Sequence, residues 1–164
     1  MILFSTWFDT PLGRLGLSWH AGGLHQLAWP GHALQDAPPE NRMTSHPAVE
    51  ALGGWLSGQQ PLPDNLPLAP SGTAFQQRVW QALRQIPAGE VWSYARVAQA
   101  IGHPNGVRAV GAAISRNPLP LFLPCHRVIG SNGRLTGFSG GMAAKRWLLE
   151  HEGIALHPLQ DRLA

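Results

Sequence analysis

A proline-rich stretch near the middle of the chain limits what the sequence can fold into. Residues 58–72 contain four prolines, at positions 61, 63, 67 and 70, and show no helical period. Proline lacks a backbone donor and breaks helices, so this composition favours an irregular connection. We therefore predict a linker over residues 59–72 between a domain at 1–58 and a domain at 73–157, with a tail at 158–164. A chain of 164 residues is long enough for two small domains.

The sequence before this linker is typical of an antiparallel sheet. Apolar residues alternate over residues 2–8, 14–19 and 24–29, and turn-forming residues separate the three runs. A short helix is predicted from Pro47 to Leu56, although two consecutive glycines weaken it. Nothing in this half indicates catalysis, and its tryptophans are expected in the core and at its rim.

The sequence after the linker is mainly helical in pattern. Thr73 and Ser93 are each placed to cap a helix, and Gly102 is suited to end one. The predicted helices cover residues 73–86, 94–101, about 106–115 and 142–151. The second and third, joined by a glycine-containing turn, resemble a helix-turn-helix, although short helix pairs often only pack together.

These patterns predict an α+β fold. The N-terminal domain would be a small α/β unit with an antiparallel sheet. The C-terminal domain would be mostly helical, with a winged-helix-like helix-turn-helix, and would carry the only cysteine.

The charge is unevenly distributed along the chain. Residues 1–72 hold two basic and five acidic side chains, a formal charge of minus three, whereas residues 73–157 hold nine basic and three acidic ones, plus six. A basic domain indicates a polyanionic partner such as nucleic acid. A solvated basic surface without a partner is the alternative.

The only cysteine lies in the stretch Pro124-Cys125-His126-Arg127-Val128-Ile129-Gly130, a turn between two apolar runs. Thiolate is the nucleophilic form of cysteine, and neighbouring positive charge favours it. A lone cysteine is otherwise more often a small buried apolar residue. The neighbouring imidazole and guanidinium leave both interpretations open at this point.

The cysteine count also limits cofactors and location. One cysteine excludes an internal disulfide and a cysteine-rich zinc site, and the eight histidines are scattered without a helical HxxxH pair. We therefore expect no metal and no other cofactor. A free cysteine suits a reducing compartment, and the sequence shows neither a signal peptide nor a run of membrane-spanning length. A cytoplasmic protein is expected.

Glu152 is predicted at the end of the last helix, directly before Gly153. A carboxylate is unfavourable there because the helix dipole places partial negative charge at that end. A residue placed against its local preference indicates a specific partner. A surface glutamate at a frayed helix end is the alternative.

Residues 73–156 closely resemble the C-terminal domain of the O6-alkylguanine-DNA alkyltransferases, also called methylated-DNA–protein-cysteine methyltransferases. The N-terminal half fits this family only loosely. The matching pieces occur in the family's order: Phe75-Gln76-Gln77-Arg78-Val79-Trp80, Ile86-Pro87-Ala88-Gly89-Glu90-Val91, Ser93-Tyr94, Arg108-Ala109-Val110-Gly111, Asn117-Pro118, Pro124-Cys125-His126-Arg127-Val128-Ile129, Gly140-Gly141, Lys145, and Trp147-Leu148-Leu149-Glu150-His151-Glu152-Gly153.

The resemblance implies a catalytic set. Cys125 would accept the alkyl group, and His126 would act as the base through a water, oriented by Glu152. Tyr94, together with the backbone at Cys125 and Val128, would hold a guanine flipped out of the duplex.

The resemblance also implies residues that bind DNA and line the pocket. Arg108 would insert into the base stack, and Asn117 would brace the helix-turn-helix against the cysteine turn. The other members of this set are Ser93, Ala109 and Arg127 at the DNA, and Ile114, Pro120 and Ser139 at the pocket. Two departures from the family are Asn105-Gly106-Val107 before Arg108, where alanines are common, and Phe138 in place of tyrosine.

The function implied is repair of O6-alkylguanine by stoichiometric, irreversible transfer of the alkyl group to Cys125, with O4-alkylthymine as a second candidate substrate. The partner would be double-stranded DNA, bound by a monomer in the minor groove and largely independently of sequence. Three alternatives remain from the residues alone: a Cys-His hydrolase or acyltransferase, a non-enzymatic DNA-damage-binding protein on the same scaffold, and a helix-turn-helix regulator.

Overall fold

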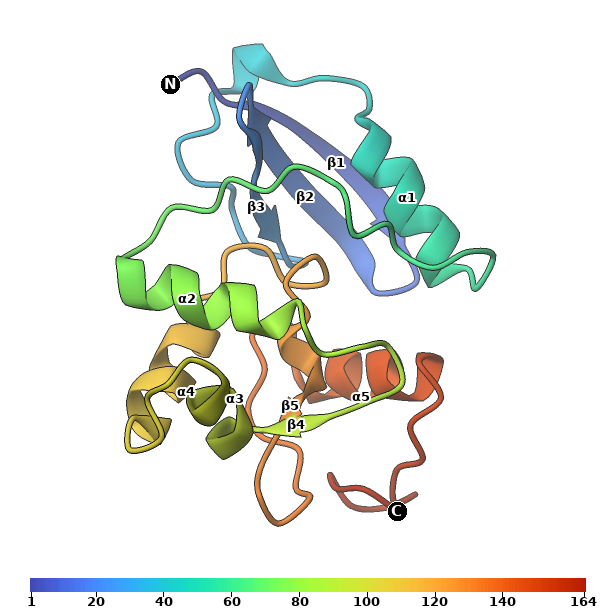
Figure 1. Ribbon diagram of the computed structural model, residues 1–164. Coiled ribbons are helices and arrows are strands. Elements are labelled where there is room, and N and C mark those ends of the chain that lie inside the picture. Colours follow the sequence, from blue (N-terminus) through green and yellow to red (C-terminus); the bar gives the residue numbers. More distant parts are fainter. The chain divides into compact units, whose positions relative to one another are not determined.

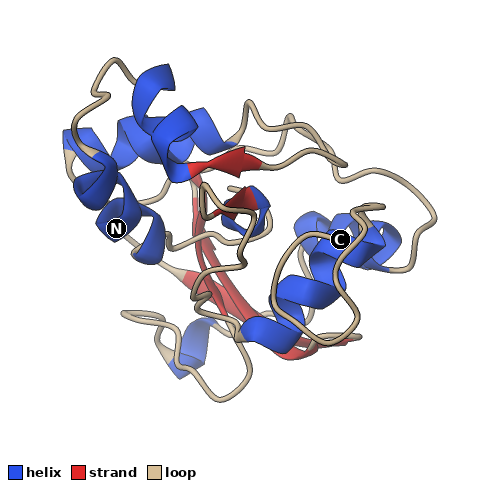
Figure 2. Cartoon of the chain, turned by 90° about the horizontal axis from the view of Figure 1, so that it is seen from below, coloured by secondary structure: helices blue, strands red, loops and turns tan.

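A computed structural model describes residues 1–164 and divides them into two units, Met1–Ser71 and Gly72–Ala164. The predicted α+β fold class is confirmed (Figure 1). The cartoon in Figure 2 shows long strands only in one three-stranded sheet, while the remaining strand pair is short. None of the helices has both the length and the apolar composition needed to cross a membrane.

The first unit is built on the predicted antiparallel meander. Its strands are β1 (Phe4–Thr10), β2 (Gly13–His20) and β3 (Gly23–Ala28), in the order β1-β2-β3. Leu15 and Leu17 of β2 are fully buried, because alternate residues of a strand point to the same face. A 3-10 helix, η1 (Pro39–Asn41), precedes α1 (Pro47–Leu56), whose inner residues Leu52 and Trp55 are buried.

Part of the stretch predicted as a linker joins this sheet. Leu24 donates to the carbonyl of Pro67 at 2.9 Å, and Ala69 donates to the carbonyl of Leu24 at 2.7 Å. Residues 67–69 therefore lie alongside β3 and belong to the first unit, so the expectation of a linker over 59–72 describes only part of this stretch.

The second unit contains the predicted helices. They are α2 (Ala74–Leu83), α3 (Tyr94–Ala100), α4 (Val107–Ser115) and α5 (Met142–His151). The expected caps are confirmed: Thr73 forms a reciprocal capping box with Gln76, and the Ser93 hydroxyl accepts from the Arg96 amide at 3.1 Å. Gly102 and Gly153 have φ values of 71° and 87°, left-handed conformations that suit the ends of α3 and α5.

Helices α2, α3 and α4 pack against one another, and α3 and α4 form the predicted helix pair joined by a turn. The buried Trp80 ring of α2 donates through Nε1 to the Ala113 carbonyl of α4 at 2.9 Å. A two-stranded parallel sheet, β4 (Trp92–Ser93) and β5 (Val128–Ile129), connects the start of α3 to the residues after a 3-10 turn, η2 (Cys125–Arg127). The winged-helix detail stays a prediction.

The last ten residues, predicted in part as a tail, fold back onto the second unit. Leu135 donates to the Asp161 carbonyl at 2.8 Å, and Leu163 donates to the Gly133 carbonyl at 2.9 Å. Arg146 of α5 donates to the carbonyls of His157 at 2.7 Å and Gln160 at 2.8 Å. The segment 155–164 is thereby fixed to both α5 and the loop at residues 130–136.

Candidate active site

The turn that carries the cysteine packs on buried residues. Leu119 and Leu123 are fully buried, and Leu121 adopts a left-handed φ of 76° that is unusual for a residue with a branched side chain. Cys125 begins the η2 turn, is 6% exposed, and its amide donates to the Leu123 carbonyl at 2.7 Å. The thiol therefore has a fixed position on a packed base.

Asn117 connects the end of α4 to this turn. Its amide group donates to the Leu123 carbonyl at 2.8 Å, and its oxygen accepts from the Leu119 amide at 2.9 Å. A hydrogen bond from Asn117 also favours the Cys125 thiolate. These contacts are the ones that a brace between the helix-turn-helix and the cysteine would make.

The cysteine is protonated in the resting site. Burial raises the pKa of Cys125 to about 11, and the hydrogen bond from Asn117 and the charge of Lys145 lower it only in part. A thiol with this pKa is a poor nucleophile near neutral pH. The site therefore needs a base to form the thiolate.

His126 and Glu152 form a buried pair next to the cysteine. His126 Nε2 lies 2.7 Å from Glu152 Oε1, and the side chains are 0% and 2% exposed. Burial lowers the pKa of His126, so the ring is neutral at rest. With Nε2 donating to the carboxylate, Nδ1 is the nitrogen that can accept a proton.

Arg127 completes this network. It donates through Nε and Nη2 to both oxygens of Glu152, and through Nη1 to the Ile86 carbonyl at 2.6 Å. Burial alone would raise the pKa of Glu152, but the hydrogen bonds from His126 and Arg127 lower it to about 2. Glu152 therefore stays ionised, and the expectation of a specific partner at the end of α5 is confirmed.

The position of Arg127 differs from the expected contact with DNA. Its side chain is 13% exposed and is fully engaged by Glu152 and Ile86. The motif places an arginine after Cys-His, but it does not reveal that a carboxylate 25 residues later lies against it.

A second buried cation was not among the predicted site residues. Lys145 of α5 is 1% exposed, and its ammonium donates to the Val128 carbonyl at 2.8 Å and more weakly to the Thr136 carbonyl at 3.4 Å. Burial lowers its pKa to about 8. One signal was available in the sequence: Lys145 is the only lysine and lies on the inner stripe of α5 with Leu148 and Leu149.

A pocket of about 300 Å³ opens beside the thiol. It brings together four of the predicted residues, Tyr94, Ile114, Cys125 and Ser139. The other residues that line it are Gly111, Ser115, Gly137 and Phe138. The Tyr94 hydroxyl forms a hydrogen bond with the Thr136 hydroxyl.

Two predicted pocket residues lie outside this lining. Pro120 is buried within the apolar run before the cysteine. Val128 is fully buried, and its carbonyl accepts from Lys145. The structure therefore does not bring either side chain to the pocket surface.

The residues expected at DNA lie on α3 and α4. Arg108 and Ala109, in the first turn of α4, are exposed. The Ser93 hydroxyl caps α3 through the Arg96 amide, and the Arg96 guanidinium lies 4.4 Å from the centre of the Trp92 ring.

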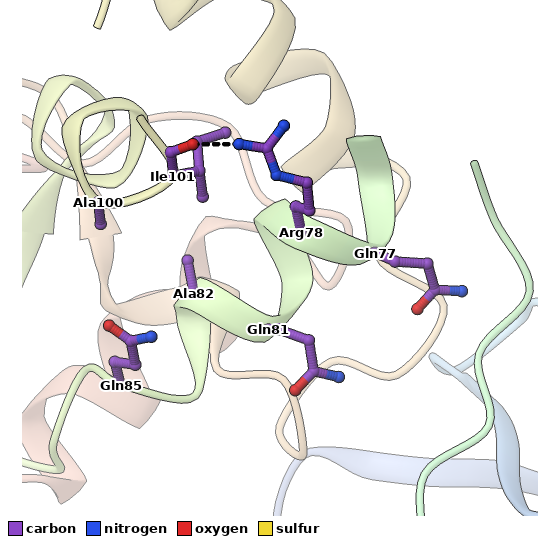
Figure 3. A pocket seen from close by; sticks show the side chains of 7 residues that line it. All are labelled: Gln77, Arg78, Gln81, Ala82, Gln85, Ala100 and Ile101. Atoms are coloured by element: carbon purple, nitrogen blue, oxygen red, sulfur yellow. Dashed lines mark hydrogen bonds between the residues drawn. The ribbon is translucent and has the colours of Figure 1, made fainter. Parts of the chain in front are cut away.

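A larger pocket lies elsewhere on the second unit, between α2 and the end of α3 (Figure 3). Its volume is about 470 Å³, and Arg78 crosses it to donate to the Ile101 carbonyl. The remaining lining residues are Gln77, Gln81, Ala82, Gln85 and Ala100. No titratable or nucleophilic group other than Arg78 lines this pocket.

No group of three or more His, Cys, Asp or Glu side chains is placed to share a metal ion anywhere in the chain.

A family model and individual relatives, compared with this chain, point to the same family. Residues 74–154 match the family described as "6-O-methylguanine DNA methyltransferase, DNA binding domain". The chain is 37% identical over 156 residues to a methylated-DNA–protein-cysteine methyltransferase of Haemophilus influenzae, which covers 93% of this chain and 87% of the relative. It is 42% identical over 157 residues to the protein of that name from Mycobacterium bovis, covering 93% of each.

Solved structures agree with these relatives. The crystal structure of Mycobacterium tuberculosis OGT in complex with DNA is similar to this chain with a TM-score of 0.81 and 38% identity, covering 92% of this chain and 93% of that one.

Proposed function

Because the chain belongs to the methylated-DNA–protein-cysteine methyltransferase family, we propose that Cys125 is the residue that receives the alkyl group from O6-alkylguanine in DNA. The chain is a DNA-repair alkyltransferase. The observation that carries the assignment to Cys125 is that the only thiol lines a pocket with the Tyr94 phenol, next to the buried His126–Glu152 pair.

The first step forms the nucleophile. The Cys125 proton passes to Nδ1 of His126, through a bridging water as the resemblance implies. The imidazolium that results is stabilised by Glu152, which is held ionised by Arg127. Arg127 is thus a positioning residue in this proposal. A carboxylate that fixes the tautomer and offsets the new charge is the usual arrangement for a histidine base.

The second step transfers the alkyl group. The thiolate sulfur attacks the alkyl carbon, a C–S bond forms, and the bond between that carbon and O6 breaks with its electron pair leaving on the guanine. Donation from the Tyr94 hydroxyl stabilises the anionic base as it leaves. The positive charge of Lys145 favours the thiolate before attack.

Access to the damaged atom requires a flipped base. O6 lies within the stacked duplex, and extruding a nucleotide costs roughly a few kcal/mol, least for a damaged pair. The exposed Arg108 in the first turn of α4 is suited to fill the vacated space, with Ser93 and Ala109 nearby on the same helix pair. Binding in the minor groove by a monomer, largely without sequence preference, is part of the proposal.

The product is a thioether, which no residue of the pocket is suited to cleave, so each chain acts once. This separates the proposed activity from a Cys-His hydrolase, which would turn over. The presence of Cys125 separates it from a protein that only binds damage. A free thiol of this kind is stable in a reducing compartment, and the cytoplasm is the proposed location.

The test is mass spectrometry after exposure to duplex DNA that contains O6-methylguanine. We expect one added methyl per chain, about fourteen daltons, on the peptide that carries Cys125, as thiolate alkylation requires. The control is Cys125→Ser, which should gain no mass. A methyl on another residue, or more than one methyl released per chain, would contradict the proposal.

A further inference from the structure

The Thr136 hydroxyl lies outside the pocket lining but contacts Tyr94, which lines it, and neither the sequence nor the reaction above assigns this hydroxyl a role. We propose that Thr136 is a positioning residue that directs the Tyr94 hydroxyl proton toward the leaving guanine. This inference rests on the proposed function and adds a residue to the same site.

The Thr136 hydroxyl contacts two polar groups that act in the transfer step: the Tyr94 hydroxyl, which stabilises the leaving base, and the Lys145 ammonium, which favours the thiolate. Its Oγ1 forms a hydrogen bond with the Tyr94 hydroxyl. The same oxygen lies 3.5 Å from Lys145 Nζ, whose shorter contact, at 2.8 Å, is with the Val128 carbonyl. One threonine oxygen therefore contacts both a phenol and a buried ammonium.

The chemistry of these three groups sets the direction of the hydrogen bonds. An ammonium has donors only, so the Thr136 oxygen presents its lone pair to Lys145. At 3.5 Å the contact is weak, but in a buried site the positive charge still orients the hydroxyl dipole. The ammonium charge repels the single Thr136 proton, which therefore turns away from Lys145 and toward the Tyr94 oxygen.

This direction leaves the Tyr94 proton available to the pocket. If Tyr94 instead donated to Thr136, the phenol would present lone pairs to a base that is becoming anionic, which is unfavourable. Successive donors also polarise one another, so Tyr94 becomes a better donor when Thr136 donates to it.

The backbone around Thr136 is held in place. Leu135 is buried, and its amide donates to Asp161 at 2.8 Å, while the Thr136 carbonyl accepts from Lys145 at 3.4 Å. The next residues along the chain, Gly137 to Ser139, line the pocket. Thr136 is therefore fixed on both sides and can hold Tyr94 at one angle.

The test compares Thr136→Val, which keeps the shape and loses the hydroxyl, with Thr136→Ser, which keeps the hydroxyl. Single-turnover transfer from duplex O6-methylguanine should slow about tenfold in Thr136→Val, the effect of one lost hydrogen bond, and return to within about threefold of the unmodified chain in Thr136→Ser. Alkylation of Cys125 by iodoacetamide should be unchanged in both, because iodide leaves without a hydrogen-bond donor.

Tyr94→Phe provides the second arm. In that background Thr136→Val should cost nothing further, since the group it orients is gone. The inference is overturned by full activity of Thr136→Val, by an equal loss with iodoacetamide, or by an undiminished loss in the Tyr94→Phe background. Failure of the unmodified chain to take up a methyl would instead overturn the proposed function, and this inference with it.

Discussion

Nε2 of His126 lies 2.7 Å from Oε1 of Glu152, and the same carboxylate receives two donors from Arg127. The Glu152 carboxylate therefore contacts both the base, His126, and the cation that keeps the carboxylate ionised, Arg127. Its removal should therefore affect both the chemistry of the thiol and the stability of the unit.

We predict that Glu152→Gln slows methyl transfer by at least about a hundredfold, the usual contribution of a positioned base. The glutamine amide can donate to Nε2, which leaves the proton on Nδ1 and removes the acceptor. The pKa of Cys125 should also rise, because the histidine no longer becomes a stabilised cation. Transfer rates and thiol titration against pH measure the two effects.

Glu150→Gln is the matched control, because Glu150 lies two residues earlier at the end of α5, is 57% exposed, and pairs only with Arg146, at 3.6 Å. It should change neither rate nor thiol pKa, and DNA affinity should persist in both variants. An unaltered thiol pKa in Glu152→Gln would remove this residue from the network.

The buried lysine predicts a pH dependence of stability. The pKa of Lys145 is lowered from 10.5 to about 8 in the folded chain. Between these two pH values the unfolded chain therefore binds more protons than the folded chain, and the free energy of unfolding increases as the pH rises. Cys125 acts in the opposite direction above pH 9, because its pKa is raised from 9.0 to about 11. From pH 8 to 9 the lysine effect is therefore the larger of the two.

Lys145→Met removes this effect. The unmodified chain should gain up to about 1 kcal/mol over the variant as the pH rises from 8 to 9, measured by denaturant unfolding. The same variant should raise the pKa of Cys125 and slow transfer, since a positive charge near the thiolate is lost. Parallel stability curves for the two proteins over this range would show that the ammonium is not desolvated.

Arg108→Ala tests the model of DNA binding. As a wedge, Arg108 matters only when a base must leave a stack, so the variant should transfer methyl much more slowly from duplex DNA and at nearly the normal rate from free O6-benzylguanine. As a phosphate contact, it would instead lower the salt slope of binding by roughly one and recover at low salt.

Arg42→Ala is the control for charge alone, because Arg42 is exposed and lies in the first unit. Its transfer rates should match those of the unmodified chain on both substrates. Equal losses on duplex and free base in Arg108→Ala would indicate a defect of the pocket.

The contacts of the last ten residues predict an effect on the loop that carries Thr136. Arg146→Gln removes the donors to His157 and Gln160, so the Leu135 amide, which donates to Asp161, should exchange faster with solvent deuterium. Transfer should slow about threefold, since Gly137 to Ser139, which follow this loop directly, line the pocket and would be less well positioned. Arg134→Gln, an exposed change in the same loop, should leave both unaltered. Unchanged exchange at Leu135 in Arg146→Gln would show that the segment does not brace the loop.

The fold class was largely predictable because its signals are local. Alternation marked the three strands, and Thr73 and Ser93 marked the helix starts that the structure confirms. The pairing of residues 67–69 with β3 was not predicted, because the prolines in this stretch indicate an irregular connection and not a strand. Pro67 supplies only its carbonyl to Leu24, a role that a proline can fill at a sheet edge.

The candidate site was predictable where the motif carried it and not where side chains meet across the fold. Cys125 and His126 are neighbours in sequence, and the unusual position of Glu152 indicated a partner. Nothing local shows that Arg127 turns inward to Glu152. The contact between Tyr94 and Thr136 joins residues 42 positions apart, and it depends on the register of a loop that no periodicity describes.

The burial of Lys145 leaves the protein surface without any lysine side chain. Lys145 is the only lysine and is buried, so every basic side chain that reaches solvent is an arginine or a histidine. Amine-reactive reagents should therefore attach to the folded protein at its terminal amine alone. Once α5 opens and Lys145 is uncovered, the burial that lowers its pKa is lost, the pKa returns toward 10.5, and the amine becomes accessible to the reagent. Acylation at this one position, read as a mass increase on a single peptide, would thus record the opening of α5 without any engineered probe.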